Sequence, residues 1–210
     1  MPAAAQEAAT LRGRVTLDAA DGIPKSDVSH IVVFLENVES GPAGPASGSS
    51  PPPQMYQLGK QFSPEVLPVV VGTTVLFPNQ DDIYHNVFSR SKAKPFDLGM
   101  IKQESIPSIH FDEAGLVKVY CNIHSYMVGY ILVLNNPFFA VTNLQGSFQI
   151  SGIPPGQYTV RAWQRFGPEE TATVPLAGGQ VQNLDFHLKE EKTSVAHKNK
   201  WGREYGTSTP

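Results

Sequence analysis

The residues best suited to chemistry lie together in one short segment near the middle of the 210-residue chain. Cys121, the only cysteine, is followed at intervals of three residues by His124 and Met127. A thiolate, two imidazoles and a weak thioether are the donor set that selects copper in a trigonal electron-transfer site. The segment therefore predicts most of a copper site, with one imidazole still to be found elsewhere in the chain.

His85 is the best candidate for that second imidazole. It follows a strand-like stretch over residues 75–79, so it can approach the Cys121 turn from a neighbouring strand. His110 alternates with two apolar neighbours and is expected to point outward. The histidines that are less suitably placed for the site are His30, His110, His187 and His197.

Two other interpretations of this segment stay open. Cys121 and Met127 are residue types that commonly fill protein cores, and His124 alone would be an ordinary turn residue. Zinc also accepts thiolate and imidazole, but it prefers four harder or thiolate ligands and does not recruit a thioether. The combination of the only cysteine, a spaced histidine and methionine, and a plausible second histidine favours copper.

Composition limits the other functions open to the chain. Lys and Arg total 16 against 19 Asp and Glu, a net charge of −3, so no basic surface for nucleic acid is expected. A single cysteine excludes an internal disulfide framework and a zinc finger. The 18 glycines and 18 prolines favour turns and short strands. The apolar runs are too short for a bilayer, so no membrane span is expected.

The elements that must position these residues are strands. The stretch 115–120 alternates between two faces and ends at Cys121, and 128–134 has the apolar pattern of a buried strand. The ligand segment thus falls between two strands of an all-β domain over residues 55–136. No window in that domain shows a helical period.

The flanking regions have strand patterns of their own. Residues 11–38 hold two strand-like runs, and residues 137–188 hold short strands separated by turns rich in Gly and Pro. The Gly, Pro, Ser and Ala tract within 39–54 is a linker by composition. Residues 189–210 form a polar tail, in which Trp201 and Tyr205 hint that part of it docks on another surface.

The central domain resembles the cupredoxin family of type 1 blue copper proteins, over about eighty residues. The resemblance rests on 71–79, His85 with Asn86, 111–115, Cys121, and His124 with Met127. The short spacing from His124 to Met127 is most similar to that of amicyanin-like members. The resemblance implies a Greek-key β-sandwich and one type 1 copper ion as cofactor.

The resemblance also implies roles for individual residues. The copper ligands would be His85, Cys121, His124 and Met127. Asn86 would join the two ligand loops and donate to the thiolate region. Two features depart from the amicyanin pattern: Ser125 replaces a proline, which predicts a less rigid loop, and the stretch 96–99 is additional.

The flanks resemble a second module, the carboxypeptidase regulatory-like or transthyretin-like β-sandwich. Its pattern occurs in two pieces, 11–38 and 137–188, so we predict a smaller sandwich split by the inserted cupredoxin domain. The alternative is that 11–38 only adds strands to the cupredoxin. A scaffolding role is preferred to a binding role, because the polar residues of this module form no obvious site.

The function predicted is that of a one-electron carrier, not an enzyme, with redox proteins docking transiently near His124. Met100, Pro107 and Tyr126 are candidates for an apolar rim around that docking site. A copper storage or delivery protein is the main alternative. A copper oxidase or nitrite reductase ranks below it, because the remaining histidines contain no His-x-His pair for a second copper centre. A metal-free β-sandwich interaction protein stays open only if Cys121 and His85 lie far apart.

The N-terminus gives no direct indication of location. It lacks the basic and apolar regions of a secretory signal, so a protein without a sorting signal is one interpretation. A processed mature chain behind an initiator Met is the other. The cupredoxin resemblance implies a periplasmic or other extracytoplasmic location.

Overall fold

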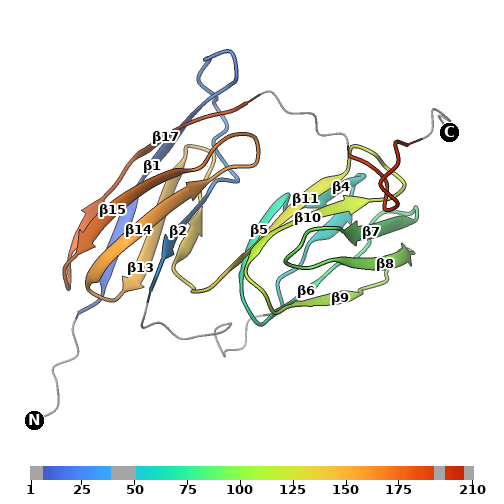
Figure 1. The fold of residues 1–210 in the computed structure, drawn as a ribbon, viewed down its shortest axis with the longest axis horizontal. Helices are drawn as coiled ribbons and strands as arrows, with labels where there is room; N and C mark the ends of the chain where they lie inside the picture. Colours follow the sequence, from blue (N-terminus) through green and yellow to red (C-terminus); the bar gives the residue numbers. More distant parts are fainter. Residues whose placement is uncertain (1–6, 39–50, 192–196, 206–210) are drawn as a thin grey trace, which may run out of the picture. The chain divides into compact units, whose positions relative to one another are not determined.

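A computed structural model describes residues 7–38, 51–191 and 197–205. All regular elements in these residues are β-strands, which confirms the predicted all-β class (Figure 1). None of the described segments forms a helix of the length and apolarity that a membrane crossing requires. The chain divides into two compact units, each built from two stretches of sequence.

Unit 1 comprises Met1–Ala43 and Asn136–Thr193 and contains two four-stranded sheets. In the first, β1 is antiparallel to β13 and parallel to both β16 and β17. The second has the antiparallel order β12-β2-β14-β15. The bounds are β1 Ala9–Asp18, β2 Val32–Glu36, β12 Phe139–Val141, β13 Ser147–Ile153, β14 Gly156–Trp163, β15 Glu170–Leu176, β16 Val181–Asn183 and β17 Phe186–Lys189.

The core of unit 1 follows from the alternation of its strands. In β1, Leu11, Val15 and Leu17 are buried, and the residues between them are exposed or half-buried. Each strand places successive side chains on opposite faces, so one face of each sheet supplies the core. Val33, on β2, and Val160, on β14, belong to the same buried cluster.

Unit 2 comprises Gly44–Asn135 and Ser194–Pro210. Its main sheet has the order β5-β11-β10-β7-β8, accompanied by the strand pairs β6-β9 and β3-β4. The bounds are β3 Tyr56–Leu58, β4 Gln61–Ser63, β5 Val66–Val70, β6 Thr73–Leu76, β7 His85–Ser89, β8 Phe96–Ile101, β9 Ser108–Phe111, β10 Gly115–Cys121 and β11 Val128–Leu134. The predicted strands 115–120 and 128–134 are thus β10 and β11.

The core of unit 2 packs between its sheets and ends at the candidate site. Phe77, Phe111 and Val119 are fully buried, and Cys121 and Met127 belong to the same cluster. The site therefore forms where the apolar core meets the loops at one end of the main sheet.

Most of the predicted linker, residues 39–50, lies outside the described residues. After it, Gln54 pairs with Leu76 and Met55 is fully buried in unit 2. In the tail region, Lys189 is the last residue of β17, whereas the stretch from Ser194 belongs to unit 2. The assignment of the two units to named domain families stays a prediction.

Candidate metal centre

Two neighbouring strands carry the first two predicted ligands. His85 begins β7, Cys121 ends β10, and the antiparallel pairing of these strands sets Cys121 opposite Val87. His124 lies in the loop between β10 and β11. The Cys121 Sγ atom is 3.7 Å from His85 Nδ1 and 3.5 Å from His124 Nδ1. One donor atom from each of the three residues lies within 4.8 Å of the other two.

Main-chain hydrogen bonds fold the ligand loop. The Cys121 N–H donates to the Met127 carbonyl at 3.2 Å, and the Met127 N–H donates to the His124 carbonyl at 3.1 Å. The Asn122 N–H donates to the Asn86 carbonyl at 2.8 Å, which ties this loop to β7. These bonds fold the loop with Ser at position 125, and its lower rigidity stays a prediction.

Burial differs among the four predicted ligands. His85 and Cys121 are fully buried, and Met127 is 1% exposed. His124 is half-buried, so it is the candidate ligand nearest to solvent. This arrangement keeps water from the thiolate and leaves one imidazole edge near the surface.

Asp81 is a partner of His85 that the sequence analysis missed. Its Oδ2 atom lies 2.9 Å from His85 Nε2, and its two oxygens also accept the N–H groups of Gly59 and Lys60 at 2.6 and 2.9 Å. A carboxylate only accepts, so the neutral imidazole carries its proton on Nε2 and directs the Nδ1 lone pair toward Cys121. The only signal in the sequence was an acid four residues before the histidine.

The surroundings of the site lower the pKa of Cys121, raise that of His85 and lower that of His124. Burial alone would raise the Cys121 pKa, but His85, which in its protonated form donates from Nδ1, and nearby main-chain N–H groups lower it overall. Burial likewise opposes protonation of His85, whose pKa is nevertheless raised by Cys121 and Asp81. Burial and the charge of His85 lower the His124 pKa. A thiolate and a neutral imidazole are the forms that bind metals.

Asn86 joins the two ligand loops through its backbone. Its carbonyl accepts from Asn122, and its main-chain N–H contributes to lowering the Cys121 pKa. Its side-chain amide instead donates to Asp97 Oδ1 at 2.7 Å and to the Gly99 carbonyl at 2.8 Å. The additional stretch 96–99 therefore forms the start of β8 and holds the Asn86 side chain.

The other histidines lie elsewhere or bind other groups. His110, on β9, is exposed and lies 3.1 Å from Thr74 Oγ1. His30 and His187 belong to unit 1. His197 lies near the ligand loop, but its Nδ1 lies 2.9 Å from the carbonyl of Lys198. Within the described part of the chain, the cluster of three or more potential metal donors is His85, Cys121 and His124.

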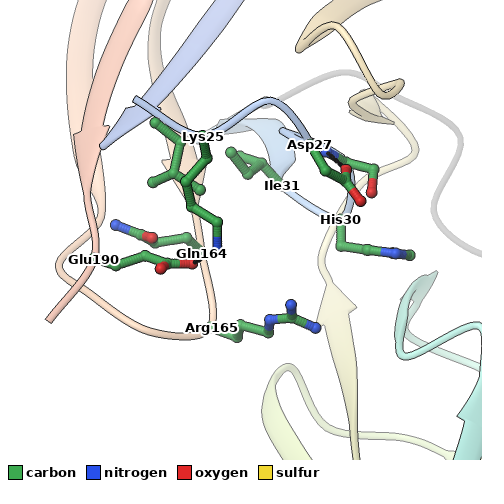
Figure 2. Close-up of a pocket in the computed structure, with 9 residues that line it drawn as sticks. Lys25, Asp27, His30, Ile31, Gln164, Arg165 and Glu190 are labelled. Atoms are coloured by element: carbon green, nitrogen blue, oxygen red, sulfur yellow. Dashed lines mark hydrogen bonds and ion pairs between the residues drawn. The ribbon is translucent and has the colours of Figure 1, made fainter. Parts of the chain in front are cut away.

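Unit 1 contains a small pocket of mixed charge (Figure 2). The amine of Lys25 is directed toward Glu190, with which it forms an ion pair of 2.7 Å. His30 has a left-handed backbone at φ 67°, and burial together with the charge of Arg165 lowers its pKa. The Lys25 and Glu190 charges neutralise each other, and the scaffolding role of this module stays a prediction.

Comparison with protein-family models and with curated proteins gave no match. Among solved structures, a purple cupredoxin from Nitrosopumilus maritimus is 28% identical, with 39% of this chain and 99% of that chain covered and a TM-score of 0.36. A reduced amicyanin mutant is 26% identical, with 49% and 98% covered and a TM-score of 0.38.

A copper-containing nitrite reductase from Thermus scotoductus is 27% identical, with a TM-score of 0.39. The match covers 46% of this chain but only 27% of the reductase. The solved structures to which this chain is similar thus include cupredoxins and a copper enzyme, and in each of these three the similarity extends over less than half of the chain.

Proposed function

We propose that this protein is a type 1 copper protein that carries single electrons between redox partners. The observation that carries the proposal is the convergence of His85 Nδ1, Cys121 Sγ and His124 Nδ1 within 4.8 Å. With the Met127 thioether as a fourth, weaker donor, these residues would hold copper as the donor set that selects it for electron transfer. Copper held by these residues would supply a one-electron couple between Cu(I) and Cu(II).

The way the protein holds these donors suits electron transfer. His85 and Cys121 belong to paired strands, and main-chain hydrogen bonds fix the loop that carries His124. Donors held by rigid elements move little when the charge at the site changes. Small rearrangement between the two oxidation states is what a fast carrier needs.

The surface around the ligand loops suits brief contacts with a redox partner. Tyr126 is 53% exposed and Tyr84 is 55% exposed, and each directly precedes a proposed ligand. Met100 is also exposed, and Pro107 is half-buried. Exposed apolar side chains beside a half-buried imidazole provide a small docking area of the kind used by transient redox complexes. We place this function in the periplasm or another extracytoplasmic compartment.

The second candidate function is copper storage or delivery, with unit 1 as a docking module. It is favoured by the half-buried position of His124, which gives an acceptor a route to the site. A carrier retains copper through repeated oxidation and reduction, whereas a delivery protein loses it readily to an acceptor. Reversible redox titration in the presence of a copper chelator separates the two functions.

The test of the main proposal is spectroscopic. The purified protein loaded with Cu(II) should show an intense thiolate-to-copper absorption band near roughly 600 nm and a narrow copper hyperfine splitting. Cys121→Ala should lose both signals. Absence of the band in the wild-type protein, with weak or no copper binding, would show the proposal to be wrong.

A further inference from the structure

The C-terminal segment His197–Tyr205, here called the strap, lies against the ligand loops of unit 2 (Figure 1). Its N-terminal residue donates from the main chain to the Ser125 carbonyl at 3.3 Å. The His197 ring lies 4.3 Å from the ring of Tyr120, the residue that precedes Cys121. The strap therefore contacts both the strand that ends at Cys121 and the loop that follows it.

Tyr205 makes the most direct contact with a proposed ligand. Its hydroxyl donates to the main-chain carbonyl of Cys121 at 2.7 Å. A carbonyl oxygen only accepts, so the tyrosine hydroxyl is the donor in this bond. Tyr205 therefore places a positive dipole end on the residue that bears the thiolate.

Lys200 connects the strap to both ligand loops. Its main-chain N–H donates to Asn122 Oδ1 at 2.9 Å, beside Cys121. Its amine pairs with Asp97 Oδ2 at 2.8 Å. The other oxygen of Asp97 accepts from Asn86, the residue that follows His85. A continuous set of hydrogen bonds therefore runs from the strap to the histidine strand and to the cysteine loop.

We infer that the strap is a positioning element for the proposed copper site, with Tyr205 and Lys200 as its positioning residues. The inference rests on the copper function proposed above. A hydrogen-bond donor aimed at the Cys121 carbonyl stabilises added negative charge near the thiolate, so it favours the reduced state. Removing the donor favours the oxidised state and loosens the loop.

The experiment compares two tyrosine variants of the full chain. Tyr205→Phe removes the hydroxyl and keeps the ring. Tyr158→Phe is the matched control, because the Tyr158 hydroxyl also donates to a main-chain carbonyl, that of Pro154, at 2.8 Å, but in unit 1. Tyr205→Phe should lower the reduction potential and shift the thiolate-to-copper band, and Tyr158→Phe should leave both unchanged. Lys200→Met should shift them in the same direction.

A second readout uses the copper-free protein. Amide hydrogen exchange across residues 121–127 should be faster in Tyr205→Phe than in the wild type and in Tyr158→Phe. In one outcome, the wild-type protein shows the blue band while Tyr205→Phe changes neither the band, nor the reduction potential, nor the amide exchange. That result would overturn the inference and leave the proposed function intact. If the wild-type protein shows no blue band, the proposed function is wrong, and so is the effect of the strap on the reduction potential.

Discussion

Asp81 Oδ2 lies 2.9 Å from His85 Nε2, on the side of the imidazole opposite to Cys121. The carboxylate is itself fixed by the main-chain N–H groups of Gly59 and Lys60. A carboxylate that orients a ligand histidine raises the basicity of the ring and fixes its tautomer. Asp81 thus connects the loop after β3 to the proposed copper site through His85.

Asp81→Asn should weaken copper binding by roughly 10- to 100-fold, the usual cost of losing such a partner. It should also raise the reduction potential, because a nearby negative charge favours the oxidised, more positive site. Copper competition with a chelator and a redox titration measure the two effects.

Asp82→Asn is the control for this prediction. Asp82 is the exposed neighbour of Asp81, and its substitution by Asn changes the net charge by the same amount as Asp81→Asn. If both variants shift the potential equally, the effect comes from overall charge, and the hydrogen bond to His85 has no special role.

The docking surface proposed around His124 predicts a charge effect on electron self-exchange. Tyr126→Glu sets like charges against each other when two copies meet at this surface, in a chain whose net charge is already −3. The rate should fall on the order of tenfold at low salt and recover partly at high salt. NMR line broadening in mixtures of the two oxidation states measures it.

Leu144→Glu is the matched control for that experiment. Leu144 is 56% exposed against 53% for Tyr126, and it belongs to unit 1. An equal fall in both variants would mean that self-exchange does not use the surface near His124.

The pairing of Asp97 with Lys200 predicts that the strap loosens in acid. Burial alone would raise the Asp97 pKa, but hydrogen bonds from Lys200, Asn86 and Gly99 lower it below the ordinary value. For a lowered pKa, the stabilisation is complete above about pH 3.9, the unfolded value, and is lost as pH falls through the folded pKa. The exchange protection of the Lys200 amide should fall in that acid range.

Asp97→Asn should remove this pH dependence and lower the protection of the Lys200 amide at neutral pH. Asp112→Asn is the control, because Asp112 pairs with Lys94 at 2.8 Å and its pKa is lowered too. If the protection of the Lys200 amide falls equally in both variants, the role assigned to Asp97 is contradicted.

The all-β class and the pairing of Cys121 with His124 could be predicted because both depend on local patterns. Alternation identified the strands, and the three-residue spacing of unusual donors identified the ligand loop. His85 lies 36 positions before Cys121, so its place in the site is predicted from an expected neighbouring strand and from the family resemblance. The structure brings these three side chains together, and their role as metal ligands stays a prediction.

Asp81 and the strap could not be predicted in the same way. The hydrogen bonds of Asp81 join it to Gly59 and Lys60, and Tyr205 reaches Cys121 across 84 positions of the sequence. A single aspartate or tyrosine is common at surfaces, so its type carries no signal without the fold. The sequence hint from Trp201 and Tyr205 is only that part of the tail docks; in the structure Tyr205 makes the contact, and Trp201 is 66% exposed.

Gly13 gives a stability test of unit 1 that is independent of copper. A Cβ atom at this position of β1 would overlap the carbonyl oxygen of Leu184, in the connection between β16 and β17. Since main-chain atoms cannot move as a flexible side chain does, Gly13→Ala should destabilise the unit by about 3 kcal/mol, at the upper end of overpacking effects. Arg12→Ala, an exposed neighbour, should cost less than about 1 kcal/mol.

Urea unfolding followed by the fluorescence of Trp163, on β14 of unit 1, measures this effect. Trp201→Phe provides the background, because Trp201 is exposed and belongs to unit 2. In the copper-loaded protein, the visible band reports on unit 2 in the same titration. In one outcome, Gly13→Ala lowers the urea midpoint reported by Trp163 fluorescence and leaves the urea midpoint reported by the visible band unchanged. In that case unit 1 unfolds separately and is not needed to hold the copper site. A common shift of both midpoints would show instead that the two units unfold as one.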